Sequence, residues 1–156
     1  MNRSKAKGKL DIFISLFDKS TAPLLSVIKD FNPNVHFLVV KEAGKLSAPR
    51  GDQEVEEDLR AVCIQKYYPE RFWDYLLCRS KDINSAWWDE CLGSFDTVKV
   101  KACARGVEGV KLLEESVGLN KELQIMFGPT YLMDNQEIFA TKDVPSKEDF
   151  KKILRK

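Results

Sequence analysis

Hydrophobic residues change their spacing along this chain, and each spacing predicts a different kind of element. Residues 9–17 are almost continuously apolar and rich in Ile and Phe, which is typical of a buried central strand. Residues 24–31 carry apolar side chains at helical spacing until Asn32-Pro33-Asn34 ends the helix, and residues 35–40 form a second apolar strand. A strand, a helix and a strand in this order predict a βαβ unit with a right-handed crossover.

The middle of the chain predicts helices. A loop is expected over residues 42–52, which contain several turn-forming glycines and a proline. From Gln53 to Leu123 the apolar residues recur at helical spacing, with breaks at Pro69, Gly93 and Gly106. In the pair Trp87-Trp88, neighbouring helical positions point in different directions, so one indole is expected to be partly exposed.

The last part of the chain returns to strands. Residues 126–139 read as two short strands joined at Asp134-Asn135, and Ser146 is placed to cap a closing helix on residues 150–154. Pro129 stands at the entrance to the first of these strands. Proline cannot donate to a sheet ladder, so it belongs at a strand's first residue, where a cis peptide bond is a purposeful feature.

Composition narrows the class of protein. With 156 residues, 44% hydrophobic and 31% charged, the chain is predicted to be one globular domain with a real core. A net charge of +1 favours neither nucleic acid nor a membrane surface as the partner, and no apolar run approaches a membrane span. The basic start, residues 1–8, is expected to be a flexible, solvated tail. No export signal is recognised, so the sequence describes either a cytosolic protein or a mature chain whose signal was removed.

Four cysteines lie in the predicted helical region: Cys63, Cys78, Cys91 and Cys103. Their even number and long spacing favour two disulfides and an exported, periplasmic or extracytoplasmic protein. A zinc-stabilised cytosolic protein is the alternative, although the tight cysteine pairs of such sites are missing. The sequence allows three connectivities and does not choose; we put forward Cys63 with Cys103 and Cys78 with Cys91. Cys63 and Cys78 follow apolar neighbours and are expected to be buried, whereas Cys91 and Cys103 are expected to be more open.

The predicted order, β-α-β, then helices, then β-β-α, resembles the thioredoxin fold with the large helical insertion of the DsbA group. The insertion is also similar to that of the gamma-interferon-inducible lysosomal thiol reductase family. The matching segments are residues 67–69, 72–78, 88–91 and 101–109, together with Gly128-Pro129-Thr130. The resemblance implies an α/β thioredoxin-like core of residues 9–45 and 124–156, and an all-helical insertion of residues 46–123 that carries all four cysteines.

The resemblance also implies where chemistry would lie. In the family a Cys-x-x-Cys pair sits where the first strand turns into the first helix, because a helix N-terminus stabilises a thiolate. The corresponding residues here are Asp18, Lys19, Ser20 and Thr21, and none is a cysteine. A hydroxyl cannot form a disulfide, and the single histidine, His36, is expected to be a packed or edge residue of a strand. We therefore expect a degenerate site without catalytic residues, cofactor or metal.

The proline loop implies binding. In the family this loop holds extended peptides, so Phe127, Gly128, Pro129 and Thr130 are the expected contacts for an extended peptide or protein partner. Such binding needs no thiol. The alternative is a thiol–disulfide oxidoreductase that uses insertion cysteines such as Cys91 and Cys103. Among the aromatic residues, Phe17, Phe127, Trp87 and Trp88 either line this groove or fill the contact between core and insertion. The oligomeric state is not defined by the sequence.

An acidic run precedes the helical region, with residues Asp52, Glu54, Glu56, Glu57 and Asp58. It lacks the regular ligand positions and the central glycine of a calcium-binding EF-hand loop. The expectation is a solvated helix start that is favoured by the helix dipole.

Overall fold

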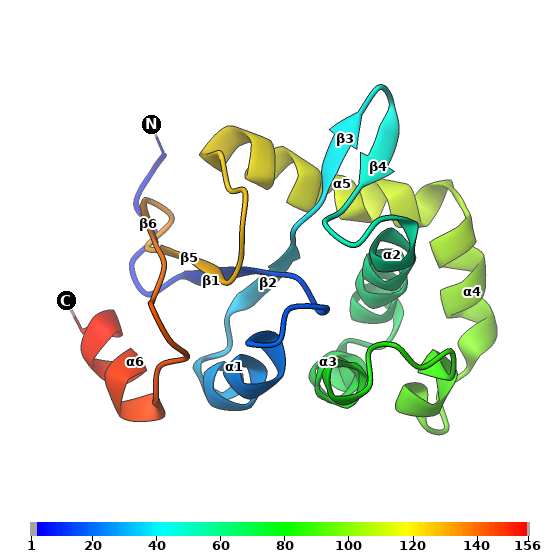
Figure 1. The fold of residues 1–156 in the computed structure, drawn as a ribbon, viewed down its shortest axis with the longest axis horizontal. Helices are drawn as coiled ribbons and strands as arrows, with labels where there is room; N and C mark the ends of the chain where they lie inside the picture. Colours follow the sequence, from blue (N-terminus) through cyan, green and yellow to red (C-terminus); the bar gives the residue numbers. More distant parts are fainter. Residues whose placement is uncertain (1–2, 156) are drawn as a thin grey trace.

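The chain forms a mixed sheet with helices on both faces, and three further α-helices stand beside it (Figure 1). The structure, a computed structural model, describes residues 3–155. The strands are β1 (Leu10–Ile14), β2 (Asn34–Phe37), β3 (Val40–Glu42), β4 (Lys45–Ser47), β5 (Thr130–Met133) and β6 (Glu137–Phe139). The α-helices are α1 (Thr21–Ile28), α2 (Asp52–Tyr67), α3 (Phe72–Lys81), α4 (Thr97–Arg105), α5 (Val107–Leu123) and α6 (Lys147–Leu154). Short 3₁₀ helices are η1 (Lys29–Phe31), η2 (Pro69–Arg71) and η3 (Trp88–Leu92).

Strand β1 lies inside the main sheet, whose order is β2-β1-β5-β6. It runs parallel to β2 and antiparallel to β5, so that Ile12 pairs with Val35 on one side and with Tyr131 on the other. All five residues of β1 are buried, as its continuous apolar pattern predicted, because helices cover both faces of the sheet (Figure 1).

The side chains of β1 alternate between two hydrophobic clusters. Ile12 and Ile14 belong to the larger one, which α1 and α6 also enter, and Phe13 packs with Leu123 and Leu132 in the smaller one beneath α5. The period of two along a strand sends successive side chains to opposite faces. Both faces of this short sheet are therefore anchored by the same strand.

Two predicted strands are shorter in the structure. β1 ends at Ile14 rather than residue 17, because the amide of Asp18 donates a hydrogen bond to the Ser15 carbonyl and closes a turn. β2 ends at Phe37, and Val40 belongs instead to the β3–β4 hairpin, where a loop was expected. The hairpin turns at Ala43 and Gly44, both with positive φ. Its three-residue strands are too short to show an alternating pattern in the sequence.

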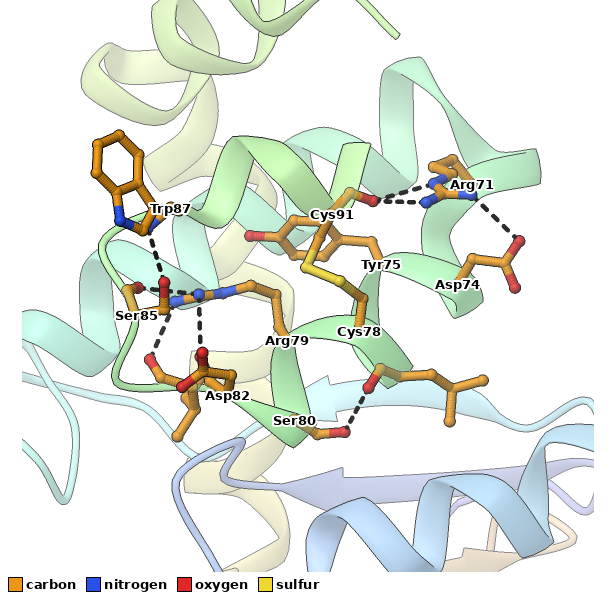
Figure 2. Close-up of a disulfide and its surroundings, with 12 residues drawn as sticks. Arg71, Asp74, Tyr75, Cys78, Arg79, Ser80, Asp82, Ser85, Trp87 and Cys91 are labelled. Atoms are coloured by element: carbon orange, nitrogen blue, oxygen red, sulfur yellow. Dashed lines mark hydrogen bonds and ion pairs between the residues drawn. A yellow bond between two sulfur atoms is a disulfide. The ribbon is translucent and has the colours of Figure 1, made fainter. Parts of the chain in front are cut away.

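The helical block is held together by two disulfides. Cys63 in α2 is bonded to Cys103 in α4, and Cys78 in α3 is bonded to Cys91 in η3 (Figure 2 shows the second bridge). These are the two pairs put forward above. Each bridge restricts the unfolded chain and typically contributes about 2–4 kcal/mol to stability. No helix among residues 3–155 is long and apolar enough to cross a membrane.

The burial of the cysteines corrects the expectation drawn from their neighbours. Cys91 and Cys103 are 5% and 3% exposed and Cys63 is fully buried, whereas Cys78 is only partly buried. The expectation that Cys91 and Cys103 are the more open residues is wrong. The polar neighbours of Cys91 and Cys103 in the sequence lie on the outer side of their helices. The two cysteines lie on the inner side, where they form the bridges.

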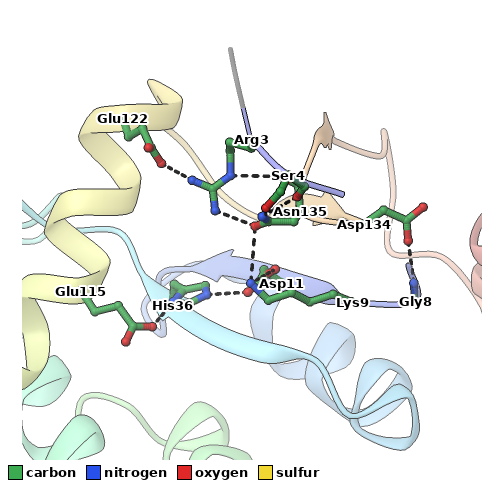
Figure 3. A network of polar contacts seen from close by, with 10 residues as sticks. All are labelled: Arg3, Ser4, Gly8, Lys9, Asp11, His36, Glu115, Glu122, Asp134 and Asn135. Atoms are coloured by element: carbon green, nitrogen blue, oxygen red, sulfur yellow. Dashed lines mark hydrogen bonds and ion pairs between the residues drawn. The ribbon is translucent and has the colours of Figure 1, made fainter. Parts of the chain in front are cut away.

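The basic start of the chain is bonded to the protein rather than free. Asp134 and Asn135 form the turn between β5 and β6, both with positive φ. The Asp134 side chain accepts a hydrogen bond from the Gly8 amide, and Arg3 donates to Asn135 and pairs with Glu122 (Figure 3). The solvated-tail expectation is therefore wrong for residues 3–8 as a whole, although the lysines within it are exposed.

The closing helix follows its sequence signal. Ser146 accepts a hydrogen bond from the Asp149 amide, and the Asp149 carboxylate accepts one from the Ser146 amide, which is a capping box. Phe150 in this helix is fully buried, and its ring lies 5.5 Å from that of Tyr131 in β5. The cap and the aromatic contact together hold α6 against the sheet.

The loop before β5 packs closely against the end of β1. The peptide bond between Gly128 and Pro129 is cis. A Cβ added at Gly128 would come within 2.8 Å of both the Phe13 carbonyl oxygen and the Leu38 Cδ1. Only glycine therefore fits at this point, and the chain must pass directly beside Phe13 and Ile14 to enter β5.

This contact predicts opposite effects for two glycine substitutions. Gly128→Ala should lower the free energy of unfolding by about 1–3 kcal/mol, because the methyl group overlaps backbone atoms of β1. Gly118→Ala is the control: its Cβ meets nothing within 4 Å in α5, so it should raise stability by up to about 1 kcal/mol. Urea unfolding of both variants measures the difference. An unchanged stability of Gly128→Ala would contradict the close contact.

Candidate functional site

The first part of the candidate site is the turn between β1 and α1. The Asp18 carboxylate accepts hydrogen bonds from the Ser20 amide at 2.9 Å and from the Ser20 hydroxyl at 2.7 Å. The buried Thr21 hydroxyl donates to the Ser15 carbonyl at 2.6 Å. Lys19 points into solvent. Both hydroxyl groups are therefore occupied in holding the start of α1.

Nothing in this turn prepares a nucleophile. Asp18, Lys19, Ser20 and Thr21 contain no sulfur, and all four cysteines of the chain are in disulfides. The single histidine, His36, is buried in β2, as expected of a packed residue. It pairs with Asp11 at 2.8 Å on the α5 side of the sheet (Figure 3). A serine or threonine needs an adjacent base to attack a substrate, and His36 is committed elsewhere.

The second part is the proline loop. Because the β5 residue Thr130 pairs with Phe13 and Gly128 touches Ile14, the loop meets β1 at the end where the Ser15–Thr21 turn begins. The Thr130 hydroxyl donates to the Phe127 carbonyl at 2.6 Å and fixes the loop. Of the four expected contact residues, Phe127 is 64% exposed, Gly128 and Pro129 are partly buried, and Thr130 is buried.

An apolar groove of about 320 Å³ adjoins this loop. It lies between the segment after β2, the β3–β4 hairpin and the segment after α5, and it is lined by Leu38, Val39, Val40, Glu42, Ser47, Ala48, Pro49, Asn120, Ile125 and Met126. Met126 is 87% exposed and directly precedes Phe127. Sequence reasoning missed Met126 and the hairpin. The only local signal was an apolar Met-Phe pair standing before Gly128.

The other aromatic candidates do not join this groove. Phe17 is partly buried in the turn after β1. Trp87 is 68% exposed beside Ser85, far along the helical block (Figure 2). Trp88 lies under the guanidinium of Arg60, so one member of the Trp87-Trp88 pair is exposed, as predicted.

The acidic run is largely buried, which overturns the solvated-helix expectation. Glu57 is fully buried and accepts hydrogen bonds from Arg79 at 2.9 Å, from Arg60 at 2.8 Å and from the Tyr75 hydroxyl at 2.6 Å. Burial also raises the pKa of Tyr75 well above its usual value. A buried carboxylate is tolerated when it is paired and fully hydrogen-bonded. These partners come from α2 itself and from α3. The sequence of the acidic segment does not by itself show that they surround Glu57.

Two other acids of the run are buried, and one of them lies near the candidate site. Glu54 is fully buried, accepts a hydrogen bond from the Arg50 amide and approaches Ser15 at the end of β1. Asp58 is also fully buried, and within residues 3–155 neither of its carboxylate oxygens has a hydrogen-bond partner. Burial raises the pKa of Glu54 and raises that of Asp58 further above its usual value, the second with help from Glu54 and Glu57. Among the described residues, no group of His, Cys, Asp or Glu is arranged to hold a metal ion.

The raised pKa of Asp58 predicts how stability depends on pH. The folded protein holds the Asp58 proton more tightly than the unfolded chain, whose carboxyl titrates near 3.8. The stabilisation is therefore complete below that pH and is lost as the pH rises toward the folded pKa. In Asp58→Asn this loss disappears, so the free energy of unfolding of the variant should exceed that of the original protein at neutral pH.

Urea unfolding from about pH 4 to about pH 8 tests this prediction. The difference between Asp58→Asn and the original protein should grow as the pH rises. Asp52→Asn, an exposed residue of the same helix, should show no such growth. A parallel pH course for all three proteins would contradict the assignment.

Solved structures with this arrangement define the fold as the DsbA-like thioredoxin fold. An oxidised variant of DsbA1 matches with a TM-score of 0.67 and 15% identity, covering 99% of this chain and 85% of the other. The catalytic domain of ScsC from Proteus mirabilis matches with a TM-score of 0.66 and 16% identity, with the same coverage. The predicted fold class is confirmed.

A third structure carries a ligand. A cysteine-to-serine variant of Proteus mirabilis DsbA with a non-covalently bound peptide matches with a TM-score of 0.59 and 11% identity, covering 99% of this chain and 97% of that one. No protein-family model matches this chain, and no curated protein matches it. At these identities the similarity defines the fold alone.

Proposed function

We propose that this protein binds extended peptide segments at the Gly128–Pro129 loop and does not turn over thiols and disulfides. One observation carries the proposal: Met126 and Phe127 are exposed beside an apolar groove. The turn that follows β1 next to this loop contains no sulfur at residues Asp18–Thr21. Large exposed apolar side chains at a rimmed groove are typical of an interaction site.

Backbone pairing supplies the affinity in this proposal. Over residues 3–155, the amides of Phe127 and Gly128 donate no hydrogen bond to another residue. An extended segment that runs beside the loop can accept from them, as an added strand does. Its apolar side chains would enter the groove between Leu38, Val40 and Met126. The peptide bound to the Proteus mirabilis DsbA variant supports this proposal by analogy of fold.

Exchange chemistry through the insertion cysteines is the second candidate, and burial disfavours it. Thiol exchange needs an exposed thiolate or an accessible disulfide. Three of the four sulfur-bearing residues, Cys63, Cys91 and Cys103, are buried, and only Cys78 is partly accessible. A zinc site would need these sulfurs as thiolates at one point, but they form two separate bridges. Two such bridges support an exported, oxidising setting.

Removal of the exposed aromatic ring tests the peptide-binding proposal. Phe127→Ala should weaken binding of a fluorescein-labelled, unstructured peptide rich in Leu and Phe by about tenfold, since aromatic anchors at interfaces often contribute more than 1 kcal/mol. Val98→Ala is the matched control, because Val98 is 67% exposed on α4, outside the groove. Fluorescence anisotropy gives both affinities. Equal binding by all three proteins would refute the proposed site.

Restoring the missing sulfurs tests the degenerate-site proposal. The double variant Asp18→Cys with Thr21→Cys places two thiols at the start of α1, where the helix dipole lowers a thiol pKa. It should gain insulin-reducing activity over the original protein, whereas Asp18→Ser with Thr21→Ser should not. Turnover by the original protein that disappears in Cys91→Ser would instead establish the second candidate. Peptide affinity is measured on the same samples, so the two halves of the proposal are judged separately.

A further inference from the structure

A second cavity lies in the helical block, away from the proline loop. It has a volume of about 210 Å³ and opens between α2 and α4 under η3; its lining residues are Glu56, Arg60, Trp88, Lys101, Ala104 and Arg105. A space of this size suits a small ion or molecule. It does not suit a protein segment of any length.

The walls of this cavity are predominantly cationic. Lys101 and Arg105 stand one helical turn apart on α4, and Glu56 and Arg60 stand one turn apart on α2. Three cations thus face one carboxylate. Over the described part of the chain neither Lys101 nor Arg105 forms an ion pair, although many of the other cations do. The cavity lining therefore has an excess of positive charge.

Arg60 supplies the guanidinium group on the α2 wall of the cavity. Its guanidinium lies 5.1 Å from the centre of the Trp88 ring, in a cation–π contact. Nη2 donates to Glu57, but Glu57 is also bound by Arg79, so one carboxylate serves two guanidinium groups. The buried Arg60 Nε has no acceptor among residues 3–155, but it is closed to solvent and does not reach a ligand in the cavity. Nη1 donates no hydrogen bond among these residues, and an oxyanion in the cavity can accept from it.

The two walls are covalently joined. Cys63 follows Arg60 by one turn of α2, Cys103 lies between Lys101 and Arg105 on α4, and the two sulfurs form one disulfide. The helices that carry the cations are therefore fixed relative to each other before any ligand arrives. Binding a ligand in such a preorganised site costs little ordering of the protein.

We propose that this cavity binds a small multivalent oxyanion, bearing phosphate or carboxylate groups, through Arg60, Lys101 and Arg105. Guanidinium groups present forked donors that match both kinds of group, and the lysine adds a point charge. Trp88 forms the apolar wall of the site. Glu56 opposes the ligand and sets a limit on its affinity. This site is independent of peptide binding at the proline loop.

Tryptophan resonances test the proposal directly. The chain has three tryptophans, Trp73, Trp87 and Trp88, so a ¹H–¹⁵N spectrum of the disulfide-bonded protein should contain three indole signals. Titration with sodium pyrophosphate and, separately, sodium citrate, at an ionic strength held constant with sodium chloride, should shift the Trp88 signal saturably. Saturation by either probe supports the site and identifies the group it prefers. No Trp88 shift with either probe overturns it.

Charge substitutions separate a built site from general attraction. Lys101→Gln and Arg105→Gln, both at exposed positions, should each weaken binding about tenfold. Glu56→Gln should tighten it severalfold, a gain that a misfolded variant could not show. Lys99→Gln removes the same charge from α4, at a residue that points toward the ring of Tyr67, and should leave the affinity unchanged. Equal weakening by Lys99→Gln and Lys101→Gln would overturn the proposal.

Discussion

The close packing of the Gly128–Pro129 loop on the end of β1 is the contact on which the functional end of this protein depends. Gly128 lies against the Phe13 carbonyl and Ile14, so the loop cannot move away without opening the centre of the sheet. Ile14 leads directly into the turn that carries Asp18 to Thr21. The same contact therefore sets the distance between the loop and the start of α1. It also leaves Phe127, the residue before Gly128, turned outward.

The helical block supplies rigidity by other means. Its interior contains a carboxylate, two guanidinium groups and a phenol, centred on Glu57, in place of purely apolar packing. Buried ion pairs contribute less to stability than their short distances suggest, but they penalise every arrangement that leaves one partner unpaired. With two disulfides added, the block has few alternative packings. Such a scaffold can hold cationic side chains apart in the α2–α4 cavity without collapse.

The two proposed binding regions therefore depend on different interactions, one apolar and one electrostatic. The groove at the proline loop is apolar and lined partly by a hairpin and loops, which suits chains of variable sequence. The α2–α4 cavity is small, charged and covalently braced, which suits a small ion of defined size. Helix α2 also carries Glu54 and Asp58, buried acids whose raised pKa values give the core a proton-dependent stability. The chain thus has the DsbA-like thioredoxin fold, and many of its buried polar groups serve packing.

The sequence by itself determined those features whose signals are local. The order of the helices and of the four strands of the main sheet, the Ser146 capping box and the Asp134-Asn135 turn each depend on a few neighbouring residues, as does the absence of cysteine from Asp18 to Thr21. The cysteine spacing also indicated disulfides. Only the tertiary structure decided the burial of Glu54, Glu57 and Asp58, the anchoring of Arg3, and the groove and cavity. For three of these features the deciding partner is distant in the chain: Glu57 meets Arg79, Arg3 meets Asn135, and Arg60 faces Lys101. A charged residue looks the same in a sequence whether its neighbour in space is water or a guanidinium group, and only the packed chain distinguishes them.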